Sequence, residues 1–123
     1  MIRQRCTITV SRRGSSKQRI QVDLGVLPAV TRIVRACQVF RLPFPCEIRA
    51  TLARSYVGMC IHNGHKKIIR LRPCVGHEMR ESLEDALDTQ AHEVAHLGIF
   101  EHGEEHDRLQ NSILAMWKKE GLE

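Results

Sequence analysis

The stretch from His92 to His102 constrains the chain more than any other part of its sequence. It reads H-E-V-A-H-L-G-I-F-E-H, so His92 and His96 are four residues apart. On an α-helix, residues at this spacing lie on the same face, one turn from each other, where two imidazoles can bind one metal ion. The segment is therefore expected to form a helix that carries a metal site.

Two further residues of this stretch have the chemistry to complete such a site. His102, six residues after His96, offers a third imidazole. Three protein ligands with one open position are typical of a catalytic zinc site. Glu93 directly follows the first histidine, where a carboxylate can take a proton from an activated water. The pattern predicts one Zn²⁺ per chain, held by His92, His96 and His102, with Glu93 as the general base.

Length and composition predict one globular domain in the cytoplasm. The 123 residues suffice for one hydrophobic core but not for two. No apolar run approaches the roughly 20 residues of a membrane helix, and the first residues lack the apolar core of a signal peptide. The five cysteines include no C-x-x-C pair, which is typical of buried thiols in a reducing compartment. Cys74 precedes the motif helix and is the thiol expected to come nearest the site.

Charge is distributed unevenly along the chain. Residues 1–75 contain 15 Lys and Arg against two acidic residues, a formal charge of +13, whereas residues 76–123 carry −8, and the net charge is +5. A basic half suits a polyanion such as nucleic acid, although ion pairs between the halves would consume much of the asymmetry. We expect weak, sequence-independent DNA binding through basic residues in or beside one polar loop: Arg12, Arg13, Lys17 and Arg19.

The pattern of apolar residues predicts an α+β fold. Residues 1–45 are expected to form a long-looped hairpin, over Cys6–Val10 and Arg19–Leu24, and a helix after Pro28. Residues 46–73 are expected to form a sheet of three consecutive strands, Glu47–Leu52, Tyr56–Ile61 and Lys67–Leu71, with a turn at Asn63-Gly64. Residues 80–120 are expected to be helical. One helix starts at a capping box, Ser82 to Asp85, and ends at His102-Gly103, and an amphipathic C-terminal helix follows.

This order of elements, and the residues around the motif, resemble the SprT-like zinc metallopeptidases and the related compact WLM-type proteases. The resemblance covers residues 56 to about 110. Leu87–Leu97 is similar to that group's L-x-T-L-x-H-E-L-A-H helix, His102–Glu105 to its H-G-P-E segment, and Tyr56–Arg72 to the hairpin before the active helix. It implies a single compact zincin-like domain over residues 1–123, with an antiparallel sheet of about three to five strands packed on the H-E-x-x-H helix and a C-terminal helix.

The resemblance also implies an activity, the hydrolysis of peptide bonds in a protein or peptide substrate. The strand Lys67–Leu71 would then lie along the cleft and pair with an extended substrate. In this chain Glu104 replaces the proline of H-G-P-E, and His106 stands where an aromatic residue usually follows. His106 is therefore an alternative third ligand, or a group that points into the cleft and polarises a carbonyl. Tyr56, the sole tyrosine, is an oxyanion donor or a packing residue.

Two other functions stay open. The spacing of the three histidines also resembles the H-G-x-L-H-L-x-G-Y-D-H segment of YbeY-type zinc endoribonucleases, and a basic surface suits RNA. Glu93 replaces that family's glycine, and a glutamate at this position is what a peptidase requires. A non-catalytic adaptor that keeps zinc for stability is the third alternative. The sequence favours the peptidase.

Overall fold

The structure is a computed structural model that describes residues 4–11, 17–76 and 80–122. In chain order its elements are β1 (Arg5–Val10), β2 (Gln18–Asp23), a short 3-10 helix η1 (Leu24–Ala29), α1 (Val30–Val39), β3 (Glu47–Ala50), β4 (Gly58–Asn63), β5 (Lys66–Leu71), α2 (Leu83–Ala95) and α3 (Glu104–Lys119). The α+β class predicted from the sequence is confirmed. None of the helices in these ranges is long and apolar enough to cross a membrane.

The five strands form one mixed sheet in the order β1-β2-β3-β5-β4. The pairs β1/β2 and β4/β5 are antiparallel, as hairpins must be, whereas β2/β3 and β3/β5 are parallel. The expected antiparallel sheet, with a meander through residues 46–73, is therefore wrong. The connection over residues 51–57 carries the chain past the position beside β3, so that β5 fills this position and β4 becomes the outermost strand.

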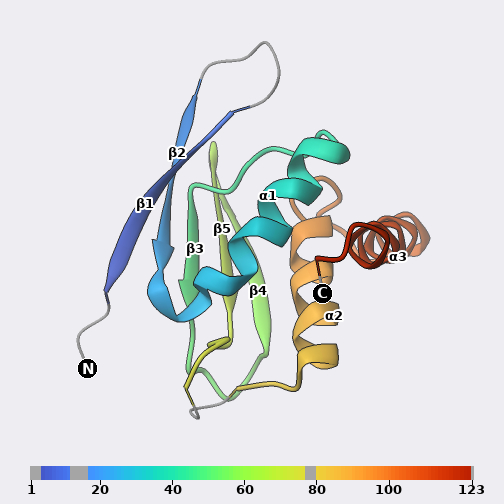
Figure 1. Cartoon of the computed structure of the whole chain (residues 1–123). Coiled ribbons are helices and arrows are strands. Elements are labelled where there is room, and N and C mark those ends of the chain that lie inside the picture. The colour runs from blue at the N-terminus through green and yellow to red at the C-terminus, as the bar shows by residue number, and fades with distance from the viewer. Residues whose placement is uncertain (1–3, 12–16, 77–79, 123) are drawn as a thin grey trace.

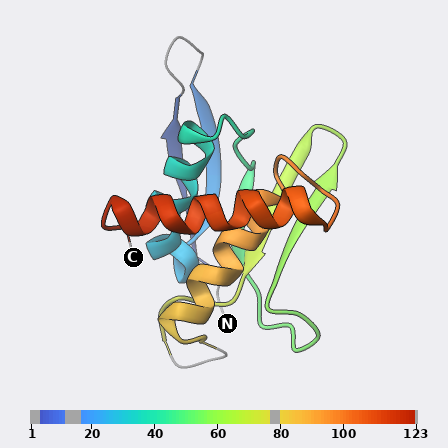
Figure 2. The same ribbon diagram turned by 90° about the vertical axis from the view of Figure 1, so that its right-hand side faces the viewer.

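All three helices lie on one side of the sheet (Figures 1 and 2). Side chains alternate across a strand, so each strand gives one row to this face, and the central strands supply buried aliphatic residues there. These residues are Ile20 and Val22 of β2, Ile48 of β3, and Ile69 and Leu71 of β5. Helix α3 crosses over α1 and α2 as an outer layer (Figure 2), where the buried Trp117 donates its indole N–H to the main-chain oxygen of Arg32 at 2.9 Å.

Helix α2 carries the H-E-x-x-H motif and begins where the sequence predicts. The Ser82 hydroxyl accepts a hydrogen bond from the backbone N–H of Asp85 at 3.2 Å, which caps the helix. The helix ends at Ala95, with His96 as its C-cap, and not at His102-Gly103 as expected. Leu97 is buried beyond this end, and a Cβ at Gly98 would lie 2.6 Å from Leu42 Cδ2. The chain therefore leaves the helix close to the core and runs to α3 as a loop over residues 97–103.

Candidate metal centre

Three imidazoles meet at the C-terminal end of α2. The Nε2 atoms of His92 and His96, one helical turn apart, are 3.2 Å from each other. The loop over residues 97–103 brings the Nε2 atom of His102 to 3.2 Å from that of His92 and 3.1 Å from that of His96. Nitrogen ligands of a tetrahedral zinc ion, each about 2.0–2.1 Å from the metal, lie roughly 3.3 Å apart. The triangle of Nε2 atoms thus has the size that one zinc ion requires.

The opposite ring nitrogens determine which tautomer two of these histidines adopt. His92 Nδ1 lies 2.9 Å from Gln110 Oε1, and His96 Nδ1 lies 3.0 Å from the main-chain oxygen of Ile99. Both partners accept hydrogen bonds, so each Nδ1 carries the proton and each neutral ring has its lone pair on Nε2. Outer partners of this kind orient metal-binding histidines. Lone pairs that face each other at 3.2 Å repel unless a cation lies between them.

Burial favours the neutral imidazoles that a metal needs. Desolvation is the main cause that lowers the pKa of His92, and it lowers the pKa of His96 to about 4. Neighbouring histidines lower both further, because a second positive charge in the cluster is unfavourable. The lowered pKa values favour the neutral form of both imidazoles, which metal binding requires.

His106, the first buried residue of α3, lies behind this cluster. Its side chain is fully buried, and its Nε2 donates a hydrogen bond to the main-chain oxygen of His92 at 3.0 Å. Its Nδ1 has no hydrogen-bond partner in the described part of the chain. The prediction that His106 points into the cleft is therefore wrong. Ring nitrogens of His92, His96 and His106 lie within 4.8 Å of one another, so this cluster could also hold a metal ion.

A pocket of about 470 Å³ opens beside the histidines. One wall is Gly58, Met59 and Cys60 of β4, the opposite wall is the last turns of α2 with Glu93, and one end is the segment 100–102. The strand expected along the cleft, Lys67–Leu71, lies instead inside the sheet, hydrogen-bonded to β3 on one side and β4 on the other. The edge strand next to the site is β4, because β5 takes the place beside β3.

Glu93 lines this pocket, although only 6% of the residue is exposed. Burial raises the pKa of its carboxyl group to about 7. The strand β4 approaches it closely at Gly58, where a Cβ would lie 3.0 Å from Glu93 Oε2 and 2.7 Å from Thr89 Cγ2. Glycine at this position leaves room for the carboxyl group between strand and helix. Gly58 was not among the residues predicted for the site.

The cysteine next to the pocket is Cys60, and not Cys74 as the sequence predicted. Cys60 of β4 lines the pocket, and no role at the site was predicted for it. Burial, and next the charge of Glu93, raise the pKa of the Cys60 thiol to about 12. Cys74 instead lies against Gln90, with 3.8 Å between Gln90 Nε2 and Cys74 Sγ, and is not among the residues that line the pocket. The strand pattern placed Cys60 on a strand, but gave no sign that this strand lies next to α2.

The remaining predicted site residues lie elsewhere. The Tyr56 hydroxyl is 3.4 Å from Thr51 Oγ1 and 3.4 Å from a guanidinium nitrogen of Arg70, and Tyr56 does not line the pocket. Arg12 and Arg13 lie outside the described residues. Lys17 and Arg19 are exposed, before and on β2. In the sheet, β2 is separated from the pocket strand β4 by β3 and β5, so any role of Lys17 and Arg19 in DNA binding would be separate from the candidate metal centre.

Few ion pairs join the described residues of the two oppositely charged halves of the chain. In the described ranges, one Lys or Arg lies within 4.0 Å of an acidic group of the other half, in the pair Arg35–Glu120 at 2.8 Å. Arg5 and Arg49 pair instead with the two acidic residues of their own half, Asp23 and Glu47. Burial raises the pKa of Glu81 and the charge of Arg72 partly opposes this rise, so contacts between described residues of the two halves offset part of the positive charge of residues 1–75.

No protein-family model matches the chain, and comparisons with curated proteins and with solved structures find no significant match. The likeness to the SprT-like group therefore depends on the motif and the segments beside it.

Proposed function

We propose that the protein is a zinc-dependent metallopeptidase of the SprT-like, zincin-type class, which hydrolyses peptide bonds of a protein or peptide substrate. One observation carries the proposal. Three Nε2 atoms form a triangle with sides of 3.1–3.2 Å, and the first two are fixed as acceptors by hydrogen bonds from their Nδ1 atoms. A buried glutamate stands beside this triangle in an open pocket.

The third ligand in this proposal is His102 rather than His106. The Nε2 atom of His102 is at ligand spacing from both other histidines, whereas that of His106 is used in a hydrogen bond to the main-chain oxygen of His92. His102 is also exposed, and a catalytic site needs one position open to water and substrate. His106 then supports the site from behind.

Zinc and Glu93 would have different roles in the proposed reaction. When bound, zinc supplies Lewis-acid chemistry that activates a water molecule and polarises a carbonyl group. Glu93 would take a proton from the attacking water as the new C–O bond forms, and would then give this proton to the amide nitrogen, so that the C–N bond breaks and the amine leaves. The outer edge of β4 offers backbone groups with which an extended substrate can pair.

The decisive experiment compares Glu93→Gln with Glu101→Gln in the zinc-loaded protein. Both side chains line the same pocket, but Glu101 is exposed and is not part of the H-E-x-x-H motif. We expect both variants to keep zinc, measured by elemental analysis. Only Glu93→Gln should lose cleavage of an unfolded protein substrate, by about 10²–10⁴-fold.

Each contrary outcome points to a different function. Equal cleavage by Glu93→Gln would mean that Glu93 is not the base. Cleavage of RNA by the unaltered protein, without proteolysis, would replace the peptidase by the YbeY-type ribonuclease. If zinc stabilises the fold and neither peptidase nor ribonuclease activity is found, the protein is the non-catalytic adaptor.

A further inference from the structure

The face of the sheet away from the helices, here called the open face, has its own cluster of basic groups. Register fixes which side chains share this face. Arg49 of β3 lies directly opposite Arg70 of β5, and both belong to the row that alternates with the buried Ile48 and Ile69. Two cations side by side on neighbouring strands repel each other. Such a pair is unfavourable unless something negative lies close to it.

A small pocket lies beside these two arginines, at the end of β3. Its volume is about 180 Å³, roughly six times the volume of one water molecule in the liquid. It is lined by Arg49, Ala50, Thr51 and Arg70, and the carboxylate of Asp23 accepts a hydrogen bond from the backbone N–H of Ala50 at 2.9 Å. The pocket is therefore polar, has two arginines in its wall, and is large enough for one small tetrahedral anion.

The arginines keep hydrogen-bonding capacity that the protein does not use. Arg49 Nε is buried and makes no hydrogen bond in the described part of the chain, although Glu47 Oε1 lies 3.0 Å away and forms an ion pair with it. Arg70 donates to the neutral hydroxyl of Tyr56 at 3.4 Å and forms no ion pair with a described acidic residue. Glu47 thus offsets part of the charge of Arg49, and Arg70 is left without a counter-charge.

We propose that this pocket binds the phosphate group of a ligand. Guanidinium groups match phosphate oxygens with paired N–H donors, and charge-assisted hydrogen bonds are the strong ones. Thr51 and Tyr56, whose hydroxyls lie 3.4 Å from each other, stand at the same end of the sheet and can donate to an anion. The site lies on the other face of the sheet from the helices and is independent of the proposed peptidase activity.

The sole tyrosine of the chain provides a direct readout. Hydrogen bonds with Thr51 and Arg70 lower the pKa of Tyr56. A phosphate dianion beside Arg70 would compete for the guanidinium group and add negative charge, and both effects raise this pKa again. Tyrosine absorbance followed through an alkaline titration should therefore shift upward in phosphate but not in chloride at equal ionic strength.

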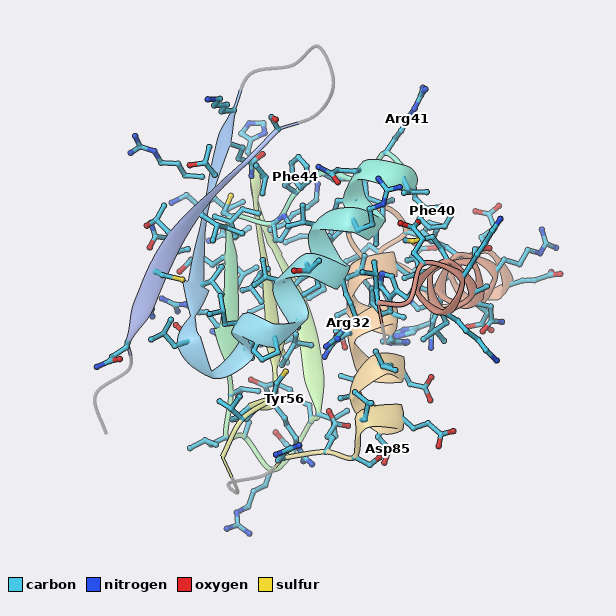
Figure 3. All side chains as sticks on the ribbon, viewed as in Figure 1. Arg32, Phe40, Arg41, Phe44, Tyr56 and Asp85 are labelled. Atoms are coloured by element: carbon cyan, nitrogen blue, oxygen red, sulfur yellow. The ribbon has the colours of Figure 1, made fainter. Side chains whose placement is uncertain are left out.

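Affinity measured by calorimetry with inorganic phosphate tests the residues. We expect Arg70→Gln and Arg49→Gln to weaken binding by about tenfold or more. Arg41→Gln removes the same charge from an exposed position at the other end of the molecule (Figure 3) and should leave the affinity unchanged. A circular dichroism spectrum and a melting curve would verify that each variant folds.

A second arm separates the sources of the phosphate group. A short single-stranded oligonucleotide with a 5′-phosphate should bind more tightly than the same oligonucleotide without it if the pocket takes a terminal phosphate. Equal binding of the two, with loss in Arg70→Gln, would assign the pocket to backbone phosphodiesters. Unchanged phosphate affinity in both pocket variants, or no shift of the tyrosine titration, would overturn the proposal.

Discussion

The Nε2 atom of His106 lies 3.0 Å from the main-chain oxygen of His92, so a fully buried histidine of α3 is hydrogen-bonded to the turn of α2 that carries the first histidine of the cluster. The ring of His106 also packs at a centroid distance of 4.1 Å from that of His96. Helix α3 therefore contacts both His92 and His96 through His106, and in the proposed metal site His106 would be a supporting residue.

This arrangement predicts opposite effects of two histidine substitutions. His102→Ala should keep the fold but weaken zinc binding by more than the roughly 10- to 100-fold that the loss of an outer partner costs. His106→Ala should keep one zinc per chain but lower the free energy of unfolding by about 2–4 kcal/mol, because it leaves a cavity and removes one of the two hydrogen bonds that the His92 carbonyl oxygen accepts. Zinc content and thermal melting measure both. Full zinc in His102→Ala with loss in His106→Ala would reverse the ligand assignment.

The close approach of β4 to α2 predicts that Gly58→Ala impairs the site without touching the histidines. A Cβ at this position would lie 2.7 Å from Thr89 Cγ2 and 3.0 Å from Glu93 Oε2, so the glutamate must move. We expect a loss of about 1–3 kcal/mol in stability and a fall in turnover with zinc retained. The control is Gly25→Ala, where the new Cβ would make ordinary contact at 3.5 Å with Ala50. Full activity of Gly58→Ala would show that Glu93 needs no fixed position.

Cys60 should be unreactive although it lines an open pocket. The thiolate is the nucleophile, and a pKa of about 12 leaves only about one thiol in ten thousand ionised at pH 8. In metal-free protein, alkylation of Cys60 should be far slower in the folded chain than after unfolding, and should accelerate as the pH rises toward 12. Mass spectrometry of the peptide that contains Cys60 measures the rate. Equal rates in the folded and unfolded chain would contradict the effect of burial.

The polar loop between β1 and β2 predicts weak DNA binding that decreases with salt. Changing Arg12, Arg13, Lys17 and Arg19 together to Ser should reduce the affinity and flatten the plot of log affinity against log salt concentration, because fewer counterions are released. Fluorescence anisotropy with single- and double-stranded DNA over a salt series measures this. The DNA affinity of Arg70→Gln, measured in parallel, shows how much of the binding is due to the open-face pocket rather than to the loop. If the wild-type protein binds no DNA at low salt, the prediction is wrong and the loop is only a solvent-exposed segment.

Local sequence patterns were sufficient to predict the type of each main element but not the pairing of strands. Alternation around Ile48 looks the same whether β3 has parallel or antiparallel neighbours, because the side-chain period is two in both cases. The end of α2 was also missed. The sequence offers a good stop at His102-Gly103, but the packing of Leu97 into the core ends the helix at Ala95, and such a contact with a distant segment leaves no local signal.

The same distinction holds at the metal centre. The four-residue spacing of His92 and His96 was enough to predict that they share a helix face, because this follows from helical geometry alone. Gly58 and Cys60 could not be predicted, since they reach the pocket only through the strand order that makes β4 the edge. The position of His106 likewise depends on how α3 crosses α2, which motif spacing does not specify.

The division of the imidazoles between a helix and a loop governs how a metal ion would leave. His92 and His96 are held by α2, whereas His102 is tethered to them by the chain over residues 97–103. Such a tether keeps the third imidazole at a high effective concentration, so a broken bond to it re-forms quickly while the other two hold the ion. The residence time of the metal ion would then depend on the stiffness of the loop over residues 97–103. Substitutions there would change the rate of metal exchange without altering any ligand.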